Sequence, residues 1–376
     1  MQHTNSININ LKLFLFPLAF LPFLWDFYIF GVKIFDTFVF ILALFCLIFF
    51  NINDLKKGSS RLYFFILFFI FFSFVGLINF GDIKGFIGLI FGIIYFYLIT
   101  LFFKKDDVDK YSFYVLVVLL ATFVFQFLST LIFGEPINYH AIVGETPRLQ
   151  NAVGYRTAGL FMEPTSYCAM MFMVISIRFL LDSYSKYELL GILSIPFSFS
   201  LYGLFLFFIL LGFWFLKMLK RRFLIYTVLF FLILIIFALF LGQAILEEGS
   251  QLFKVVNRLS SISNDESTLY RYSLRDNFSF FTLMFGSGLS TEGGLRYGSF
   301  GLGYLLSGVG LIGLIILVFV SIDFYRKKLL FIFSILFVIL LSSSYWTFLA
   351  FWMWLSWIYI VLKPSENLEV SSYIKA

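Results

Sequence analysis

Long, continuous apolar stretches fill most of this chain, and they limit its fold more than any other feature of the sequence. They lie at about residues 11–30, 34–50, 62–79, 86–103, 111–133, 164–181, 188–201, 203–219, 223–242, 299–322, 329–344 and 345–362. Inside a bilayer, only helices and closed barrels satisfy every backbone N–H and C=O group. The stretches lack the alternation of polar and apolar residues that barrel strands require. The sequence therefore predicts an all-α polytopic membrane protein, with about twelve transmembrane helices in a single membrane domain covering residues 1–376.

The composition excludes a water-soluble fold. Charged residues make up 13% of the chain and the mean hydropathy is +0.98, whereas about 25% of the residues in soluble domains are charged. The net charge of +6 agrees with the excess of lysine and arginine on the cytoplasmic side of membrane proteins, so we expect no nucleic-acid partner. Cys46 and Cys168 lie in different apolar stretches and indicate neither a disulfide framework nor a metal motif.

The segment 188–219 decides the topology. It is long for one transmembrane helix and short for two, and Pro196 with the serine-rich sequence SFSLYG predicts a break inside it. Two spans place most lysine and arginine residues on one side of the membrane, whereas one span moves the basic cluster at 217–222 to the other side. We therefore expect two spans here, an uncleaved first span, and both termini in the cytoplasm.

Two long polar segments interrupt the apolar stretches, at about 134–160 and 243–298, and this topology makes both of them extracytoplasmic loops. Among the charged residues in these loops and directly after the first are Arg148, Arg156, Arg258, Arg271, Arg275, Arg296, Glu135, Glu145, Glu163 and Glu292. In this otherwise apolar chain, arginines and acids are thus concentrated on the extracytoplasmic face of the membrane. That pattern predicts a membrane-embedded site for an anionic, lipid-linked substrate.

The end of the first loop reads YRTAGLFMEP and leads into the sixth stretch. Pro164 suits the first turn of a helix, where its missing N–H has no hydrogen bond to lose. Glu163 is either a cap favoured by the helix dipole or a general base at the mouth of the helix. Arg156 is either an interface anchor or a ligand for phosphate oxygens, which its planar guanidinium suits. His140 is either a solvated loop residue or a proton carrier near pH 7.

The second loop, of about 55 residues, is too long to be an inert connection. Arg271 and Arg275 are four residues apart, so a helix there would present both on one face. Tyr270 would help to lay that helix on the membrane surface. Gly286 and Gly288 follow in FGSGLSTEGG and indicate a tight turn, which is either a plain loop or a cradle for phosphate.

Several motifs are missing from the sequence. It has no HExxH or GxSxG, the triplet Asp107-Val108-Asp109 of DxD type lies outside both long polar loops, and the adjacent acids Asp265 and Glu266 are read as solvated. We therefore expect an enzyme without a metal ion or cofactor, acting on an activated donor that already carries its leaving group on a lipid.

From about residue 134 onward the chain resembles the superfamily of O-antigen polymerases (Wzy-type) and O-antigen ligases, which are polytopic enzymes that use polyprenyl-diphosphate-linked glycans. In RTAGLFMEPTSYCAM, five residues fit the family pattern: Arg156, Gly159, Phe161, Glu163 and Pro164. Further likenesses are a loop arginine followed by FGSGLS, the break SFSLYG, the span YLLSGVGLIGLIILV and the final aromatic span SSSYWTFLAFWMWLSW.

The resemblance implies a glycosyltransferase in the bacterial cytoplasmic (inner) membrane. It would polymerise undecaprenyl-diphosphate-linked repeat units on the outer face into a surface polysaccharide, as lipopolysaccharide, capsule or exopolysaccharide. Its partners would be the lipid-linked donor and acceptor glycans, membrane lipid and a polysaccharide chain-length regulator. The catalytic residues would be Glu163, Arg156 and Arg271. The substrate-binding residues would be Arg275, Arg258, Arg148, His140 and Tyr270, and the structural ones Gly159, Pro164, Gly286 and Gly288.

Two departures from the family pattern bear on this expectation. The stretch LRYGSFGLGYLLSG lacks the histidine that ligases of the superfamily carry near the end of the large loop, which favours a polymerase over a ligase. SFSLYG lacks the arginine that often accompanies the family's break. The alternative from another class is a flippase or other transporter of lipid-linked oligosaccharides, for which Arg178 and Asp26 would be the charged residues within spans.

Overall fold

The computed structural model describes residues 17–23, 28–29, 32–49, 60–140, 150–151, 154–218, 279–289, 306–316 and 349–362. Its helices are α2 (Ile34–Phe49), α3 (Ser60–Phe80), α4 (Ile83–Phe102), α5 (Lys105–Phe133), α6 (Pro164–Leu180), α7 (Lys186–Ser194), α8 (Leu201–Met218), α12 (Phe280–Phe285) and α16 (Leu349–Leu362). Residues 17–23 and Leu306–Ile316 are also helical, and a short 3₁₀ helix, η3, covers Pro196–Ser198.

Two small antiparallel hairpins accompany the helices. β1 (Tyr28–Ile29) pairs with β2 (Val32–Lys33), and β3 (Gln150–Asn151) pairs with β4 (Gly154–Tyr155). Each strand has only two residues, so the prediction of a helical fold class is confirmed for the ranges given above.

The helix predicted over 11–30 is wrong at its C-terminal end. Residues 17–23 are helical, but Ile29 lies opposite Val32 in a hairpin. A two-residue connection that contains glycine, between strands rich in β-branched and aromatic residues, favours such a hairpin. The chain therefore reverses its direction before α2 begins.

Two of the described helices are long and apolar enough to cross a membrane. They are α4, over Gly85–Phe102, and α5, over its whole length. Five apolar segments are shorter: Leu67–Phe80, Pro164–Leu180, Tyr202–Phe215, Leu306–Ile316 and Leu349–Leu362. On α5, large apolar side chains such as Phe125 and Phe133 are exposed, at 64% and 77%, as expected for a helix that faces lipid.

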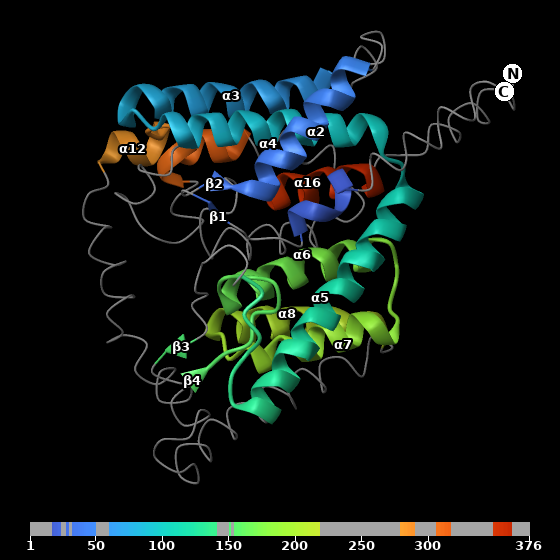
Figure 1. Cartoon of the computed structure of the whole chain (residues 1–376). Coiled ribbons are helices and arrows are strands. Elements are labelled where there is room, and N and C mark those ends of the chain that lie inside the picture. Colours follow the sequence, from blue (N-terminus) through green and yellow to red (C-terminus); the bar gives the residue numbers. More distant parts are fainter. Residues whose placement is uncertain are drawn as a thin grey trace, which may run out of the picture.

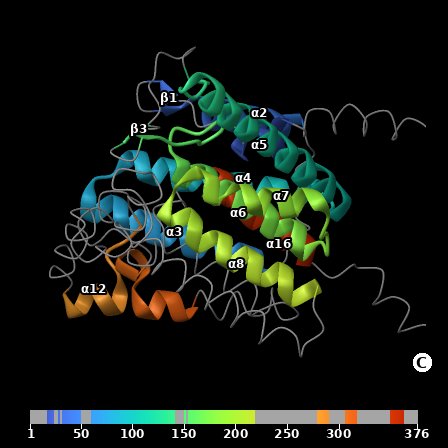
Figure 2. The same cartoon turned by 90° about the horizontal axis from the view of Figure 1, so that it is seen from below.

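The helices form two layers around α16. Figure 1 shows α3 and α4 in one layer, with α12 at one end of it, and α5 to α8 in the other. α16 lies between them and packs against α4, α6 and α5. From below, α6, α7 and α8 run side by side (Figure 2).

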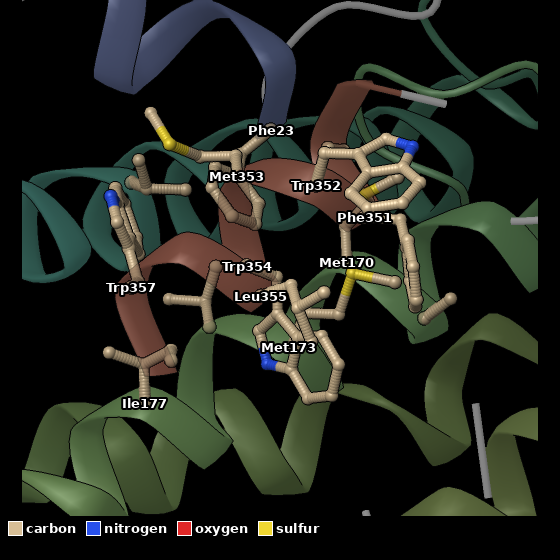
Figure 3. Packing of buried hydrophobic residues seen from close by; sticks show 14 of the residues in the cluster. Phe23, Met170, Met173, Ile177, Phe351, Trp352, Met353, Trp354, Leu355 and Trp357 are labelled. Carbon is tan, nitrogen blue, oxygen red and sulfur yellow. The ribbon is translucent and has the colours of Figure 1, made fainter. Parts of the chain in front are cut away.

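The tryptophans of α16 form the centre of the core (Figure 3). Trp352, Trp354 and Trp357 are fully buried. The indole N–H of Trp354 donates to Ser176 Oγ on α6 at 2.9 Å, which satisfies a polar atom that would be costly to bury alone. A Cβ atom at Gly92 of α4 would lie 2.1 Å from the Trp352 ring, so glycine is needed there for close packing.

The segment from α5 to α8 runs back and forth. Asp109 near the start of α5 pairs with Arg178 near the end of α6, while Phe123 further along α5 stacks on Tyr167 near the start of α6. α5 and α6 are therefore antiparallel. We call the end of this layer that contains Asp109 and Arg178 the basal end, and the end that contains Gln126 and Glu163 the apical end.

The break predicted at Pro196 is confirmed. α7 ends at Ser194, η3 follows, and Phe199 has a left-handed backbone with φ 53° before α8 begins. Ser198 contacts Cys168 at one end of α6, and Trp214 packs on Phe179 at the other. α8 therefore runs back alongside α6, so residues 188–219 form two antiparallel segments. The predicted span 188–201 is wrong in length, because α7 has nine residues and extends only about 13 Å.

Candidate functional site

Gln126, a fully buried residue of α5, holds the end of the first loop in place. Its side-chain oxygen accepts hydrogen bonds from the backbone N–H groups of Ala158 (2.7 Å) and Gly159 (2.8 Å). Gly159 has φ +59°, a conformation that favours glycine, and its Cα faces α5 so closely that a Cβ atom would lie 3.4 Å from Thr122 Oγ1. The segment that carries Arg156 and Glu163 is thus fixed on the side of α5.

The start of the first loop folds back along the same helix. Ser129 Oγ donates to the carbonyl oxygen of Glu135 at 2.9 Å, and Gln126 Nε2 donates to that of Ile137 at 2.8 Å. The Tyr139 hydroxyl donates to the carbonyl oxygen of Thr122 at 3.1 Å, and burial raises its pKa above the ordinary tyrosine value. Residues 134–140 and 156–163, here called the two arms of the loop, therefore lie beside the apical end of α5.

His140 ends the first arm and is buried, with 1% of its surface exposed. Its backbone N–H donates to Asn138 Oδ1 at 2.8 Å. The interpretation of His140 as a solvated loop residue is therefore wrong, because the arm is largely exposed over residues 134–138 but ends with the His140 side chain packed into the protein.

Glu163 occupies the position directly before the first turn of α6. Its backbone is extended, Pro164 follows as the first helical residue, and the Glu163 carbonyl accepts from the N–H groups of Ser166 and Tyr167. Its side chain makes no capping hydrogen bond to the helix, but accepts a bond from Thr165 Oγ1 at 3.3 Å. The carboxylate is partly exposed. Its side chain is therefore not committed to capping α6.

Arg156, which is partly exposed, lies beside a polar cluster where α6 meets the break between α7 and α8. Its guanidinium is close enough to Cys168 to act on it electrostatically. The Cys168 thiol is 3.0 Å from Ser198 Oγ. Residues that are far apart in the sequence thus bring one guanidinium close to a small group of hydroxyl and thiol side chains.

A second polar contact lies beside this cluster. The Tyr167 hydroxyl and Ser194 Oγ, both buried, are 2.6 Å apart. Gly203 of α8 packs so tightly here that a Cβ atom would lie 2.5 Å from Cys168 Sγ. Ser194 and Ser198 thus contact side chains of α6 and also donate to the carbonyl oxygens of Gly191 and Ile195, so they satisfy backbone groups where the helix is broken.

A separate charged network closes the basal end. Arg178 Nε donates to Glu188 Oε1 at 2.8 Å, and its other nitrogens donate to Ser183 Oγ at 2.6 Å and to the carbonyl oxygen of Asp109 at 2.9 Å. Arg178 also forms an ion pair with the Asp109 carboxylate. Glu188 accepts from Ser183 and from the backbone and hydroxyl of Ser185. Arg178 lies in the last turn of α6, where the helix dipole favours a cation.

The FGSGL turn of the second loop is bound to protein rather than open to a ligand. The N–H groups of Ser287, Gly288 and Leu289 donate to the carbonyl oxygens of Ser307 (2.7 Å), Gly308 (2.8 Å) and Phe72 (2.8 Å). The interpretation of this turn as a phosphate cradle is therefore wrong, because its donors are already used.

The two predicted glycines allow this tight approach. Gly286 and Gly288 have φ +77° and +97°, and a Cβ atom at Gly288 would lie 1.9 Å from the Gly76 nitrogen of α3. The side chain of Asn79 adds a hydrogen bond to the carbonyl oxygen of Ser287 at 2.7 Å. The turn thereby fastens the end of the second loop to α3.

The predicted site residues are only partly covered by the structure. Arg156, Glu163, His140, Gly159 and Pro164 belong to the two arms or to the start of α6. The predicted residues outside the described ranges are Arg148, Arg258, Tyr270, Arg271 and Arg275, and Asp26 of the transporter alternative. Sequence reasoning missed Gln126, although an amide side chain inside an apolar stretch signals a polar partner. It gave Ser198 and Cys168 no role. Among the described residues, no group of His, Cys, Asp and Glu could hold a metal ion.

Comparisons with protein-family models, with curated proteins and with solved structures found no match to this chain.

Proposed function

We propose that this protein is a metal-independent glycosyltransferase of the bacterial cytoplasmic membrane, which polymerises undecaprenyl-diphosphate-linked repeat units on the outer face. The observation that carries the proposal is the placement of Arg156 and Glu163 on one arm that is fixed beside α5. This arm presents a guanidinium, and a carboxylate that does not cap the helix, at the mouth of α6. A diphosphate and a reacting hydroxyl need these two kinds of group.

The proposed topology has about twelve transmembrane helices and cytoplasmic termini. The direction of α8 supports it, because α8 returns to the basal end, where Lys105 begins α5 and Lys186 begins α7. Basic residues at that end follow the bias for the cytoplasmic side. The apical end then faces outward and carries both arms of the first loop.

The depth of the apical groups supports a membrane-embedded site. If the transmembrane part of α5 begins near Tyr111, Phe123 lies about 18 Å along the helix. Tyr167 stacks on Phe123, so the break between α7 and α8 lies about 12 Å inside the outer edge of a hydrocarbon core about 30 Å thick. Broken helix and loop backbone at that depth must be covered by protein or line a water-filled cavity.

The chemistry follows from these groups. A hydroxyl of the acceptor glycan attacks the anomeric carbon of the donor, and the bond from that carbon to the diphosphate oxygen breaks. The proton of the hydroxyl passes to the Glu163 carboxylate. The leaving undecaprenyl diphosphate keeps the electron pair, and Arg156 with Arg271, supported by Arg275, stabilises its charge in a low-dielectric site. The roles of Arg271 and Arg275 rest on the sequence resemblance.

The proposal is tested by replacing Arg271 with alanine in the cells that make the polysaccharide. Arg271→Ala should abolish the polymer, because removal of one donor to a developing anion costs about 100-fold or more in rate. Polymer length is read on gels, and membrane abundance of the variant is measured in parallel. Arg271→Lys should be impaired less, since it keeps the charge but not the planar fork. Polymer of normal length in Arg271→Ala cells would exclude Arg271 from the site.

Among the described residues, the broken segment α7–η3–α8 favours a flippase or transporter, since such proteins bind substrates at discontinuous helices. Against it, Arg178 is paired at a helix end and is not isolated at mid-depth. Deletion of the gene separates the two classes. Loss of a polymerase leaves single repeat units exported to the outer face, whereas loss of a flippase leaves them trapped inside.

A further inference from the structure

Gln126 has no role in the proposed chemistry, yet its buried side chain bonds to both arms of the first loop. It is 1% exposed, and it makes three hydrogen bonds to loop backbone, all between 2.7 and 2.8 Å. Both ends of its amide are used. The oxygen accepts from Ala158 and Gly159 of the second arm, and the nitrogen donates to Ile137 of the first.

We infer that Gln126 is a positioning residue for the transfer reaction, which links the His140 arm to the arm that carries Arg156 and Glu163 and so sets their placement against α6. This inference rests on the proposed function. A side-chain amide can accept from one arm through its oxygen and donate to the other through its nitrogen at the same time. No apolar residue of similar size can replace either bond.

The positions of these hydrogen bonds in the sequence explain why loss of the Gln126 side chain should disturb Arg156 and Glu163. Ala158 is two residues after Arg156, and Gly159 is four residues before Glu163. Two adjacent N–H groups that converge on one oxygen fix the local backbone in a single turn, with Gly159 at φ +59°. Loss of that oxygen releases the turn between both groups. A displacement of about 1 Å at a reacting centre is enough to reduce the rate about 100-fold.

The neighbouring Ser129 provides a matched control. It lies on the same face of α5, is also buried, and donates one hydrogen bond to the carbonyl oxygen of Glu135. Ser129→Ala therefore removes a bond to the first arm alone. It leaves the second arm, with Arg156 and Glu163, attached to the helix.

The first measurement is hydrogen–deuterium exchange of the purified full-length protein in lipid nanodiscs, read on peptides that cover 156–163. Gln126→Leu should speed exchange of these amides, because Ala158 and Gly159 lose their acceptor. Gln126→Glu keeps an acceptor oxygen and should remain close to the wild type, as should Ser129→Ala. Unchanged exchange in Gln126→Leu would overturn the inference. This measurement does not depend on what reaction the protein performs.

The second measurement is the rate of polymerisation in the same nanodiscs. The substrate is the undecaprenyl-diphosphate-linked repeat unit extracted from cells that lack this gene. Gln126→Leu should lower kcat about 10-fold to 100-fold with KM within about twofold, because the reacting groups are misplaced while other contacts to the substrate remain. Gln126→Glu keeps the acceptor for the second arm but, when ionised, not the donor to Ile137, so it should recover kcat only in part.

The two readouts separate the two ideas. Faster exchange together with unchanged kcat in Gln126→Leu would overturn the positioning role while leaving the proposed function intact. A wild-type protein that does not polymerise the repeat unit would overturn the proposed function and with it the kinetic role of Gln126. The exchange data would still decide whether Gln126 holds the arm.

Discussion

The two ends of the α5–α8 layer use the same kinds of residue in different ways. At the basal end, Arg178 and Glu188 meet directly, with side chains that are 9% and 0% exposed. Arg178 also binds Asp109 of α5, and Glu188 binds the serines of the connection before α7. These hydrogen bonds and ion pairs join helices or the connections at their ends. This network holds α5, α6 and α7 together.

At the apical end, an arginine and a glutamate again lie near the end of a loop and the start of a helix. The hydrogen bonds that hold the loop against α5, however, are made by other residues. Gln126 and Ser129 bind the backbone of the two arms, and the arms carry Arg156 and Glu163. The charged side chains there remain partly exposed. The comparison teaches that residue type alone does not separate a structural ion pair from a candidate site. What separates them is whether the charged groups themselves hold the helices together.

The largest effect should follow from loss of the basal arginine. Arg178→Ala leaves Glu188 buried without its cation, which typically costs about 3–5 kcal/mol of folding stability. We expect little folded protein and a strongly lowered thermal unfolding midpoint in detergent, measured by the fraction that stays monodisperse after heating.

Arg156→Ala is the matched control at the other end of the layer. Its side chain is partly exposed, so the expected loss of stability is below about 1 kcal/mol, whereas polymer synthesis should stop. Similar losses of stability in the two arginine variants would break the comparison, because both arginines would then be structural.

A smaller effect is expected at the helix break. Gly203→Ala places a Cβ atom 2.5 Å from Cys168 Sγ, and overpacking of this kind costs about 1–3 kcal/mol. Adding Cys168→Ala to the same chain removes the clashing sulfur and should restore part of the lost stability. The measurement is a double-mutant cycle of unfolding midpoints. Equal losses with and without Cys168→Ala would mean that α8 does not approach α6 as closely as the contact with Ser198 indicates.

Much of the helical architecture could be predicted, because the position and length of each apolar stretch can be read directly from the local sequence. α2, α3, α4, α6 and α16 begin and end within a few residues of the predicted spans. The break at Pro196 was also predictable, since proline and serine disfavour a continuous helix. The hairpin at Tyr28–Ile29 was not, because a stretch rich in aromatic and β-branched residues suits either a helix in lipid or a short strand pair.

The site was predictable in its residue types but not in its arrangement. Arg156, Glu163 and Pro164 follow from charge placement and helix-start signals. The attachment of the first loop to α5 does not, because it depends on bonds between Gln126 and backbone groups 11 and 32 residues away in the sequence. Sequence patterns carry no information about which distant carbonyl or N–H a buried amide will meet. For the same reason His140 was open to interpretation as a solvated residue, although it is buried.

The smallest effect on stability should come from Glu163→Gln, and it sharpens the comparison most directly. Because the Glu163 side chain makes no capping hydrogen bond to α6, the substitution should change the unfolding midpoint little, within about 0.5 kcal/mol. Glutamine keeps the size of the side chain but cannot take a proton, so a general-base role predicts a loss of polymerisation rate of about 100-fold or more. The rate is measured on lipid-linked repeat units beside Thr165→Ala, which removes the hydroxyl that donates to the carboxylate and should leave most of the rate intact. Full activity in Glu163→Gln would assign the apical carboxylate, like Glu188 at the basal end, to the architecture of the helix.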